Sequence, residues 1–108
     1  LYIDDAINAI IRTIRIKKKI ENQIINIGLG KCEKLKKIME IVKKQTKFFK
    51  PKYGKITLRK DESMKSYPDI KRAKKVLKWR AKTNLNEGIR KTINFYKKTL
   101  KTNRLKVF

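Results

Sequence analysis

The chain has 108 residues, of which 40% are hydrophobic, so it is long enough for one domain or a part of one. A single cysteine, Cys32, and the lack of histidine argue against an internal disulfide, a serine–histidine catalytic triad and a conventional zinc site. No apolar run approaches the ~20 residues of a membrane-spanning helix, and the cysteine content favours a reducing compartment, so we expect a cytoplasmic protein.

The net charge of +23 has two interpretations. A strongly basic small protein often binds nucleic acid, because its contacts with phosphate groups release counterions. Lysine, however, supplies 25 of the 32 basic residues, and the lysines scatter along the chain instead of forming one stripe. Nucleic-acid surfaces usually depend more on arginine. We therefore favour compositional bias and keep a small basic nucleic-acid-binding protein as the alternative.

The first half of the chain predicts two helices with a short strand between them. Residues 4–18 are expected to form an amphipathic helix, capped by Asp4 or Asp5. One face of this helix carries Ile3, Ala6, Ile7, Ile10, Ile11 and Ile14. Residues 23–27 have the pattern of a short buried strand, which ends at a glycine-containing turn. The second helix covers residues 33–45, and its inner side carries Leu35, Ile38, Met39, Ile41 and Val42.

The middle of the chain is predicted to be mostly irregular. Residues 46–55 form a basic loop that contains Phe48, Phe49 and Tyr53, a pattern also found in nucleic-acid-binding loops but weak on its own. A second short strand is expected at residues 55–59.

Two further helices are predicted in the second half. Pro68 and Asp69 suit the opening of the third helix, and Trp79 is expected to pack into the core after its end. Asn84 can cap the fourth helix, with Glu87 three residues on. The apolar side of the third helix carries Ala73, Val76 and Leu77, and the buried stripe of the fourth carries Leu85, Ile89, Ile93, Tyr96 and Leu100. Residues 101–108 are expected to be a frayed basic tail.

The stretch from Tyr67 to Ile89 is the most informative part of the chain. It follows the pattern P-D-x-x-x-A-x-x-x-L-x-W-x-P-K-T-x-L-x-E-G-L at nearly every position. This pattern resembles the C-terminal signature of the extended short-chain dehydrogenases/reductases, the nucleotide-sugar epimerases and dehydratases. Asn26, Gly28 and Gly30 match the N-x-G-x-G turn of that family, although Lys34 stands where the family usually has a capping serine or threonine. Residues 1–5 are similar to the segment that precedes a helix packed against the family's sheet.

The resemblance implies an α/β fold of about four helices with short strands. Residues 1–100 would form the C-terminal substrate-binding lobe of a two-part enzyme, whose Rossmann cofactor domain is absent from this chain. NAD(P) would be the cofactor of the parent enzyme, a nucleotide-diphosphate sugar its substrate, and a separate N-terminal Rossmann half a candidate partner. We expect the chain to be inactive alone, as a truncated copy, a split-gene half or the product of a decaying gene.

Arg59 and Glu62 are the candidate substrate-binding residues. In the resembling enzymes an arginine ten residues before the aspartate of the D-x-x-x-A helix contacts the substrate's pyrophosphate. An acidic residue three places after that arginine contacts the ribose. Arg59 and Asp69 have this spacing, and Glu62 holds the acidic place. A guanidinium grips phosphate oxygens with paired hydrogen bonds, so the chemistry is suitable; without the resemblance both residues would be ordinary surface charges.

Two partial motifs are rejected on physical grounds. The turn at residues 28–30 begins like a dinucleotide-binding loop, but Glu33 stands where a third glycine should be and brings negative charge toward a pyrophosphate. Tyr67 and Lys71 have the Y-x-x-x-K spacing of the catalytic pair, but Pro68 places Tyr67 before its helix begins. We therefore expect no catalytic residue in this chain and no cofactor bound by it alone.

Overall fold

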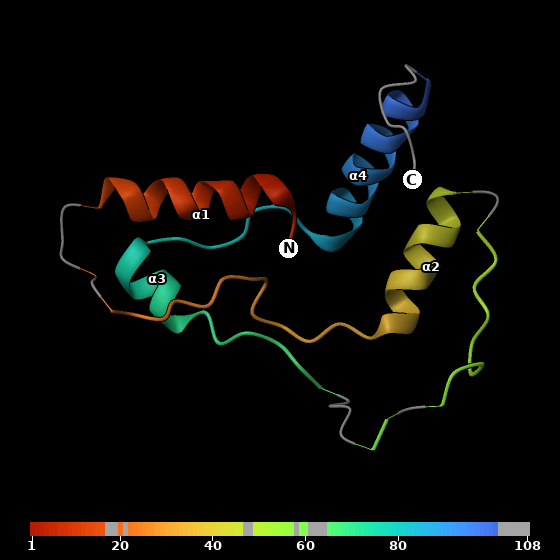
Figure 1. Ribbon diagram of the computed structural model, residues 1–108, viewed down its shortest axis with the longest axis horizontal. Coiled ribbons are helices and arrows are strands. Elements are labelled where there is room, and N and C mark those ends of the chain that lie inside the picture. The colour runs from red at the N-terminus through yellow and green to blue at the C-terminus, as the bar shows by residue number, and fades with distance from the viewer. Residues whose placement is uncertain (17–19, 21, 47–48, 58, 61–64, 102–108) are drawn as a thin grey trace.

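Four helices make up the regular structure of the protein in a computed structural model that describes residues 1–16, 20, 22–46, 49–57, 59–60 and 65–101. They are α1 (Ile3–Arg15), α2 (Leu35–Gln45), α3 (Lys71–Leu77) and α4 (Leu85–Lys101). α1 packs against α3 and α2 against α4, so the molecule consists of two helix pairs (Figure 1). The two pairs meet where the start of α1 lies beside the segment that leads into α4.

The predicted strands are absent from the described residues, so the expected α/β fold is wrong there. Residues 23–27 run beside α3, where Arg72 Nη1 donates a hydrogen bond to the carbonyl of Ile24 at 2.7 Å. A strand exists only through backbone pairing with a neighbouring strand, and no such neighbour lies against residues 23–27 within the described part of the chain. Residues 55–59 are likewise not a strand at their described positions, with Leu58 outside the described residues.

The core is small and lies between α1 and α3. Its buried members are Ala9, Ala73, Leu77 and Trp79, and Trp79 is only 2% exposed, which confirms its predicted place in the core. Half-buried apolar side chains surround this group: Ile16, Ile20, Ile25, Ile27, Val76 and Ala81. The segment that resembled a strand therefore contributes its isoleucines to the core without forming a sheet.

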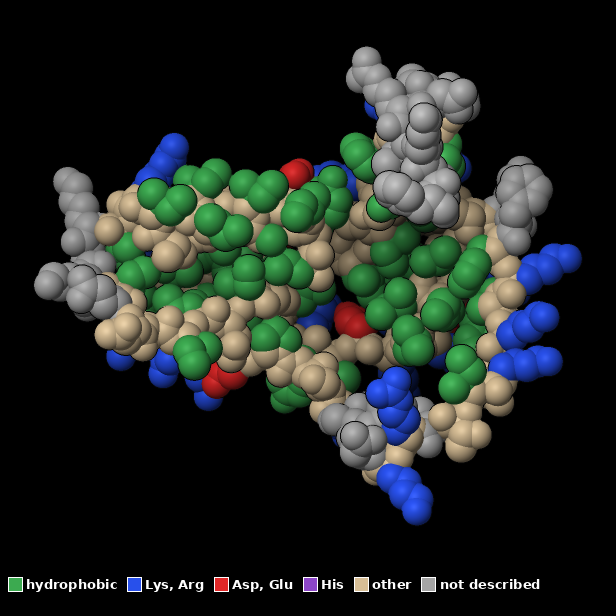
Figure 2. Space-filling model, in the orientation of Figure 1, with side chains coloured by type: hydrophobic (Ala, Val, Ile, Leu, Met, Phe, Trp, Pro, Cys, Tyr) green, Lys and Arg blue, Asp and Glu red, His purple; other side chains and the backbone are tan. Residues whose placement is uncertain are grey.

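α1 has the predicted apolar face, but none of the described residues covers it. Ile3, Ile7, Ile10 and Ile14 are 60%, 47%, 57% and 77% exposed. The helix buries Asp5 and Ala9 instead. Figure 2 shows one side of the molecule, with hydrophobic side chains exposed along α1 and over α2 and α4. Lysine and arginine side chains lie at the edges of this view. An amphipathic helix usually buries such a face, so its exposure among the described residues is unusual.

The cap predictions succeed at α4 and fail at α1. Asn84 Oδ1 accepts a hydrogen bond from the Glu87 N–H at 2.9 Å, which satisfies one of the free donors at the start of α4. α1 has no side-chain cap hydrogen bond, so neither Asp4 nor Asp5 caps it. Lys34 precedes α2 without capping it, as expected for a side chain that has no acceptor.

α3 is held at both ends by other parts of the chain. At its start, Asp69 Oδ1 accepts from the Lys71 N–H at 2.9 Å. At its end, Lys78 adopts the left-handed conformation (φ 51°, ψ 33°), and the Trp79 N–H donates to the carbonyl of Ala73 at 3.2 Å. Arg12 of α1 donates through Nη1 to the carbonyls of Leu77 and Lys78 at 3.3 and 2.8 Å. A cation thus lies where the α3 dipole is negative.

The predicted buried stripe of α4 is only half correct. Leu85, Ile89 and Ile93 are half-buried, in the part of α4 that packs on α2. Tyr96 and Leu100 are 52% and 55% exposed. In Figure 1 the distal half of α4 projects away from the rest of the molecule, which explains their exposure.

Candidate functional site

Of the two predicted substrate-binding residues, the structure describes only one. Arg59 is exposed in the irregular segment between α2 and α3. Glu62 lies outside the described residues, so the structure does not bring the pair together or separate it. The arginine–carboxylate pair stays a prediction.

The structure does bring the two signature motifs together. A Cβ atom added to Gly28 would clash with the ring of Pro68, and one added to Gly30 would lie 2.7 Å from Ile70 Cγ1. Gly30 also has a φ of +69°, which side chains other than glycine rarely adopt. The glycines of the N-x-G-x-G turn are therefore required because the P-D segment packs directly on them.

A buried carboxylate that the sequence assigned to a cap joins the two helix pairs. Asp5 is 7% exposed, and its two oxygens accept hydrogen bonds from the backbone N–H groups of Lys82 and Thr83 at 3.1 and 2.9 Å. Burial acts to raise the pKa of Asp5, but the hydrogen bonds from Lys82 and Thr83 outweigh it and hold the pKa below its ordinary value of 3.8. Asp5 is thus ionised at neutral pH and acts as a structural link, which only its place in the family segment at residues 1–5 hinted at.

A second polar contact lies beside this link. Lys91 of α4 pairs with Glu87 at 3.1 Å, and its ammonium lies 5.2 Å from the centre of the Tyr2 ring. The hydrogen bond with Glu87 raises the pKa of Lys91. Tyr2 therefore contacts α4 through a cation–π interaction, which adds to the connection between the helix pairs.

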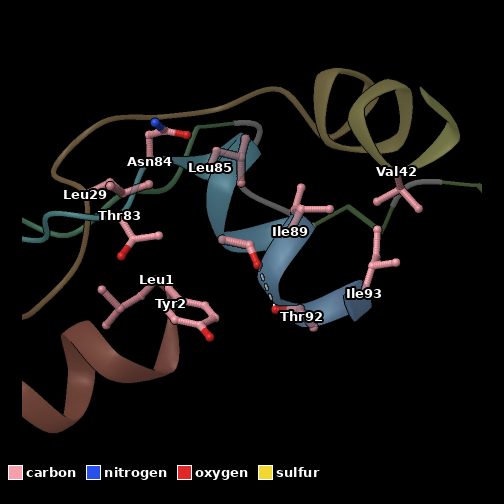
Figure 3. A pocket seen from close by; sticks show the side chains of 11 residues that line it. Leu1, Tyr2, Leu29, Val42, Thr83, Asn84, Leu85, Ile89, Thr92 and Ile93 are labelled. Carbon is pink, nitrogen blue, oxygen red and sulfur yellow. Dashed lines mark hydrogen bonds between the residues drawn. The ribbon is translucent and has the colours of Figure 1, made fainter. Parts of the chain in front are cut away.

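An apolar cavity of about 270 Å³ lies between the N-terminal residues, α2 and α4 (Figure 3). Its walls are mainly aliphatic, from Leu29, Val42, Leu85, Ile89 and Ile93, with Tyr2 at the N-terminal side. The Thr92 hydroxyl donates to the carbonyl of Gly88 at 2.9 Å, so it is already satisfied within α4. This lining offers no acid–base pair or nucleophile for chemistry.

The turn at residues 28–33 does not fit a dinucleotide. Glu33 accepts from Lys37 at 2.7 Å and pairs with Lys31 at 3.2 Å. These hydrogen bonds lower the pKa of Glu33, so a negative charge stands before α2, where a pyrophosphate would have to bind.

The other sequence candidates for chemistry are not assembled into a site. Tyr67 is 58% exposed and precedes α3, while Lys71 is the first residue of that helix.

Among the described residues, no group of three or more cysteine or acidic side chains could hold a metal ion. None of the helices in the described part is long and apolar enough to cross a membrane.

Sequence reasoning missed one group of side chains. Lys71, Arg72 and Lys75 of α3 line a polar cavity of about 540 Å³ together with Gln23 and Asn26. The spacing of the two lysines was visible in the sequence as an i, i+4 pair, but their neighbours across the cavity come from a distant segment.

Comparisons with known proteins agree with the signature residues. The model of the family described as GDP-mannose 4,6 dehydratase matches residues 2–92. The chain is 30% identical over 95 residues to the CDP-abequose synthase of Salmonella muenchen, which covers 87% of this chain and 32% of that protein. It is 32% identical over 101 residues to a UDP-glucuronate 4-epimerase of Thermodesulfobacterium geofontis, with 92% and 30% covered. The chain thus spans about a third of the length of these relatives, and no solved structure matches it.

Proposed function

We propose that the chain forms the substrate-side part of a nucleotide-sugar-converting enzyme. This proposal starts from its family: the chain belongs to the nucleotide-sugar epimerases and dehydratases, which are extended short-chain dehydrogenases/reductases. In this role it binds a nucleotide-diphosphate sugar, while a separate cofactor-binding part supplies NAD(P) and the catalytic residues. The names of the matching family and relatives contain GDP, CDP and UDP sugars, so the diphosphate is the part that their ligands share.

The observation that carries this proposal is the isoleucine face of α1, which no residue in the described part of the chain covers. Four isoleucines on one helix, between 47% and 77% exposed, leave a continuous apolar stripe in water. Burying a fully exposed isoleucine contributes roughly 1.5–3 kcal/mol, and each of these partly exposed side chains would contribute about half of that or more when covered. Glu33 holds a negative charge at the turn before α2, where a pyrophosphate would have to bind, so we place the cofactor in another part of the enzyme. A cofactor-binding part packed on this face would supply both the missing cover and the missing chemistry.

The docking prediction can be tested by reconstitution. We expect the chain to form a complex with the folded cofactor-binding part of a family member that has been cut before the segment corresponding to residue 1. Ile10→Lys should weaken this complex roughly tenfold or more, because a lysine would have to be desolvated at the interface. Size-exclusion chromatography and calorimetric titration measure the complex, and circular dichroism verifies that α1 persists.

Asn94→Lys is the matched control, because it adds the same charge to an exposed position of α4. It should leave the affinity within about twofold of the wild type. The absence of a complex with a folded partner, or an equal loss in both variants, would contradict docking on α1.

Substrate binding is the second part of the proposal, and we assign it to Arg59 and Glu62. A ligand at 100 times its dissociation constant should stabilise the protein by about 2.7 kcal/mol, which a thermal shift detects. CDP, UDP and GDP sugars are the probes. Arg59→Glu should sharply reduce the shift, because it replaces the guanidinium with a charge that repels phosphate. Arg80→Glu makes the same charge change in another exposed loop and should retain it; an unchanged shift in Arg59→Glu removes Arg59 from the site.

A further inference from the structure

The cationic cavity beside α3 belongs to no function assigned above. It has a volume of about 540 Å³ and lies between residues 23–26 and α3. Lys71, Arg72 and Lys75 bring three positive charges to it, and Asp69 brings one negative charge. Gln23 and Asn26 add two amide side chains, which can donate as well as accept.

The walls of this cavity are fixed in place by close packing. Gly28 and Gly30 lie directly against Pro68 and Ile70, so the segment that follows residues 23–26 is pressed onto the segment that leads into α3. Arg72 completes the attachment, because its Nη1 donates to the carbonyl of Ile24 at 2.7 Å. This hydrogen bond orients the guanidinium before any ligand arrives, and a donor that is already oriented loses less entropy on binding.

The cations of the cavity are only weakly neutralised. Asp69 uses Oδ1 to accept from the Lys71 N–H, and its Oδ2 is 4.0 Å from Lys71 Nζ, the limit of an ion pair. The Lys71 side chain is 93% exposed, so its ammonium can move toward a ligand. The positive charge comes from side chains alone, because Asp69 already takes the first free N–H of α3 and the helix has only seven residues.

The arrangement suits a ligand that carries several adjacent phosphates. Lys71 and Lys75 lie one turn apart on the same face of α3, with Arg72 anchored beside them. Arginine binds phosphate oxygens in pairs, and lysine acts as a mobile point charge. Ile24 and Val76 add an apolar wall, against which a sugar or a base can pack.

We propose that this cavity is a polyphosphate-binding site, separate from the Arg59 site, for adjacent phosphates of a nucleotide or of a single-stranded nucleic-acid backbone. It does not depend on the proposed enzyme function, since its residues lie on α3 and residues 23–26 and are independent of α1 docking. The net charge of +23 would attract any polyanion weakly, so a site is distinguished from diffuse attraction by its dependence on these particular lysines.

The test uses inorganic tripolyphosphate as the probe at ~150 mM salt, where long-range attraction is screened. Lys71→Gln/Lys75→Gln should weaken binding roughly tenfold or more, because two direct phosphate contacts are lost. Lys36→Gln/Lys43→Gln removes the same charge from exposed positions of α2 and should change affinity by less than about twofold. Amide spectra should show tripolyphosphate shifting the signals of residues 23–27 and 69–76.

Competition identifies the source of the phosphates. Displacement of tripolyphosphate by UDP or CDP indicates a nucleotide, and displacement by a single-stranded RNA oligomer at lower concentration indicates a nucleic-acid backbone. No binding by the wild-type protein would overturn the proposal. Equal losses in the two double variants, or amide shifts spread over all four helices, would also overturn it, because binding would then follow net charge alone.

Discussion

At the scale of single residues, Asp5 links two distant segments of the chain. Its carboxylate accepts two backbone hydrogen bonds in a buried place, and these bonds join residues separated by more than 70 positions. Hydrogen bonds to a charged group contribute about 1.5–3 kcal/mol each when buried. Asp5→Asn has nearly the same shape, but it is uncharged and its amide nitrogen cannot accept a hydrogen bond, so one of the two N–H groups loses its partner. The substitution should therefore lower the free energy of unfolding by about 2 kcal/mol.

The pH dependence of stability follows from the same carboxylate. Because the pKa of folded Asp5 lies below 3.8, its contribution is fully present above pH 3.8 and is lost as the pH falls through the folded pKa. Urea unfolding between pH 6 and 2 measures this loss of stability. In Asp5→Asn the free energy of unfolding should depend much less on pH over this range. Asp4→Asn changes an exposed carboxylate of the same turn and is the control. A stability loss in Asp4→Asn as large as in Asp5→Asn would contradict the assignment.

At the scale of elements, the end of α3 carries a conformational cost. Lys78 has a left-handed backbone, which costs a residue with a side chain roughly 1–2 kcal/mol relative to glycine. Lys78→Gly should therefore raise the free energy of unfolding by about 0.5–1 kcal/mol, after subtraction of the extra entropy that glycine loses on folding. The hydrogen bond from Arg12 to the carbonyl of residue 78 involves only backbone at that position and should persist.

Lys74→Gly is the control for this element, because it places the same residue inside the helix. It should lower the free energy of unfolding by about 1 kcal/mol. Denaturant titration of the three proteins at one pH compares them directly. If both glycine variants are destabilised equally, the left-handed turn is not a source of strain.

At the scale of the whole molecule, the chain is open. Its radius of gyration is 17.4 Å, against about 13 Å for a compact domain of 100 residues. Four side chains form the buried core of the described part, and the isoleucines of α1 stay in water. A net charge of +23 adds self-repulsion to this shortage of burial. A partner that covers α1, as proposed above, would therefore also increase stability, which links the docking experiment to the fold.

Much of the local structure could be predicted from the sequence. The four helices and the Asn84 cap depend on neighbours within a few residues, so spacing and side-chain type were sufficient. The core position of Trp79 was predicted from its place between an apolar helix and a turn. Arg59 was found as a candidate through the family spacing alone, and its partner Glu62 lies outside the described residues. The strands were wrong because pairing depends on a distant segment, which a run of apolar residues cannot reveal.

The sequence by itself determined which segments form helices, where α4 is capped and which family the signature belongs to. These are properties of residues that are near one another in the chain. Only the tertiary structure decided that Asp5 ties α1 to residues 82–83, that Gly28 and Gly30 receive Pro68 and Ile70, and that three cations of α3 share a cavity with residues 23–26. It also decided that none of the described residues covers the apolar face of α1. Each of these depends on which distant segments pack together, and packing is set by the whole fold and not by local pattern.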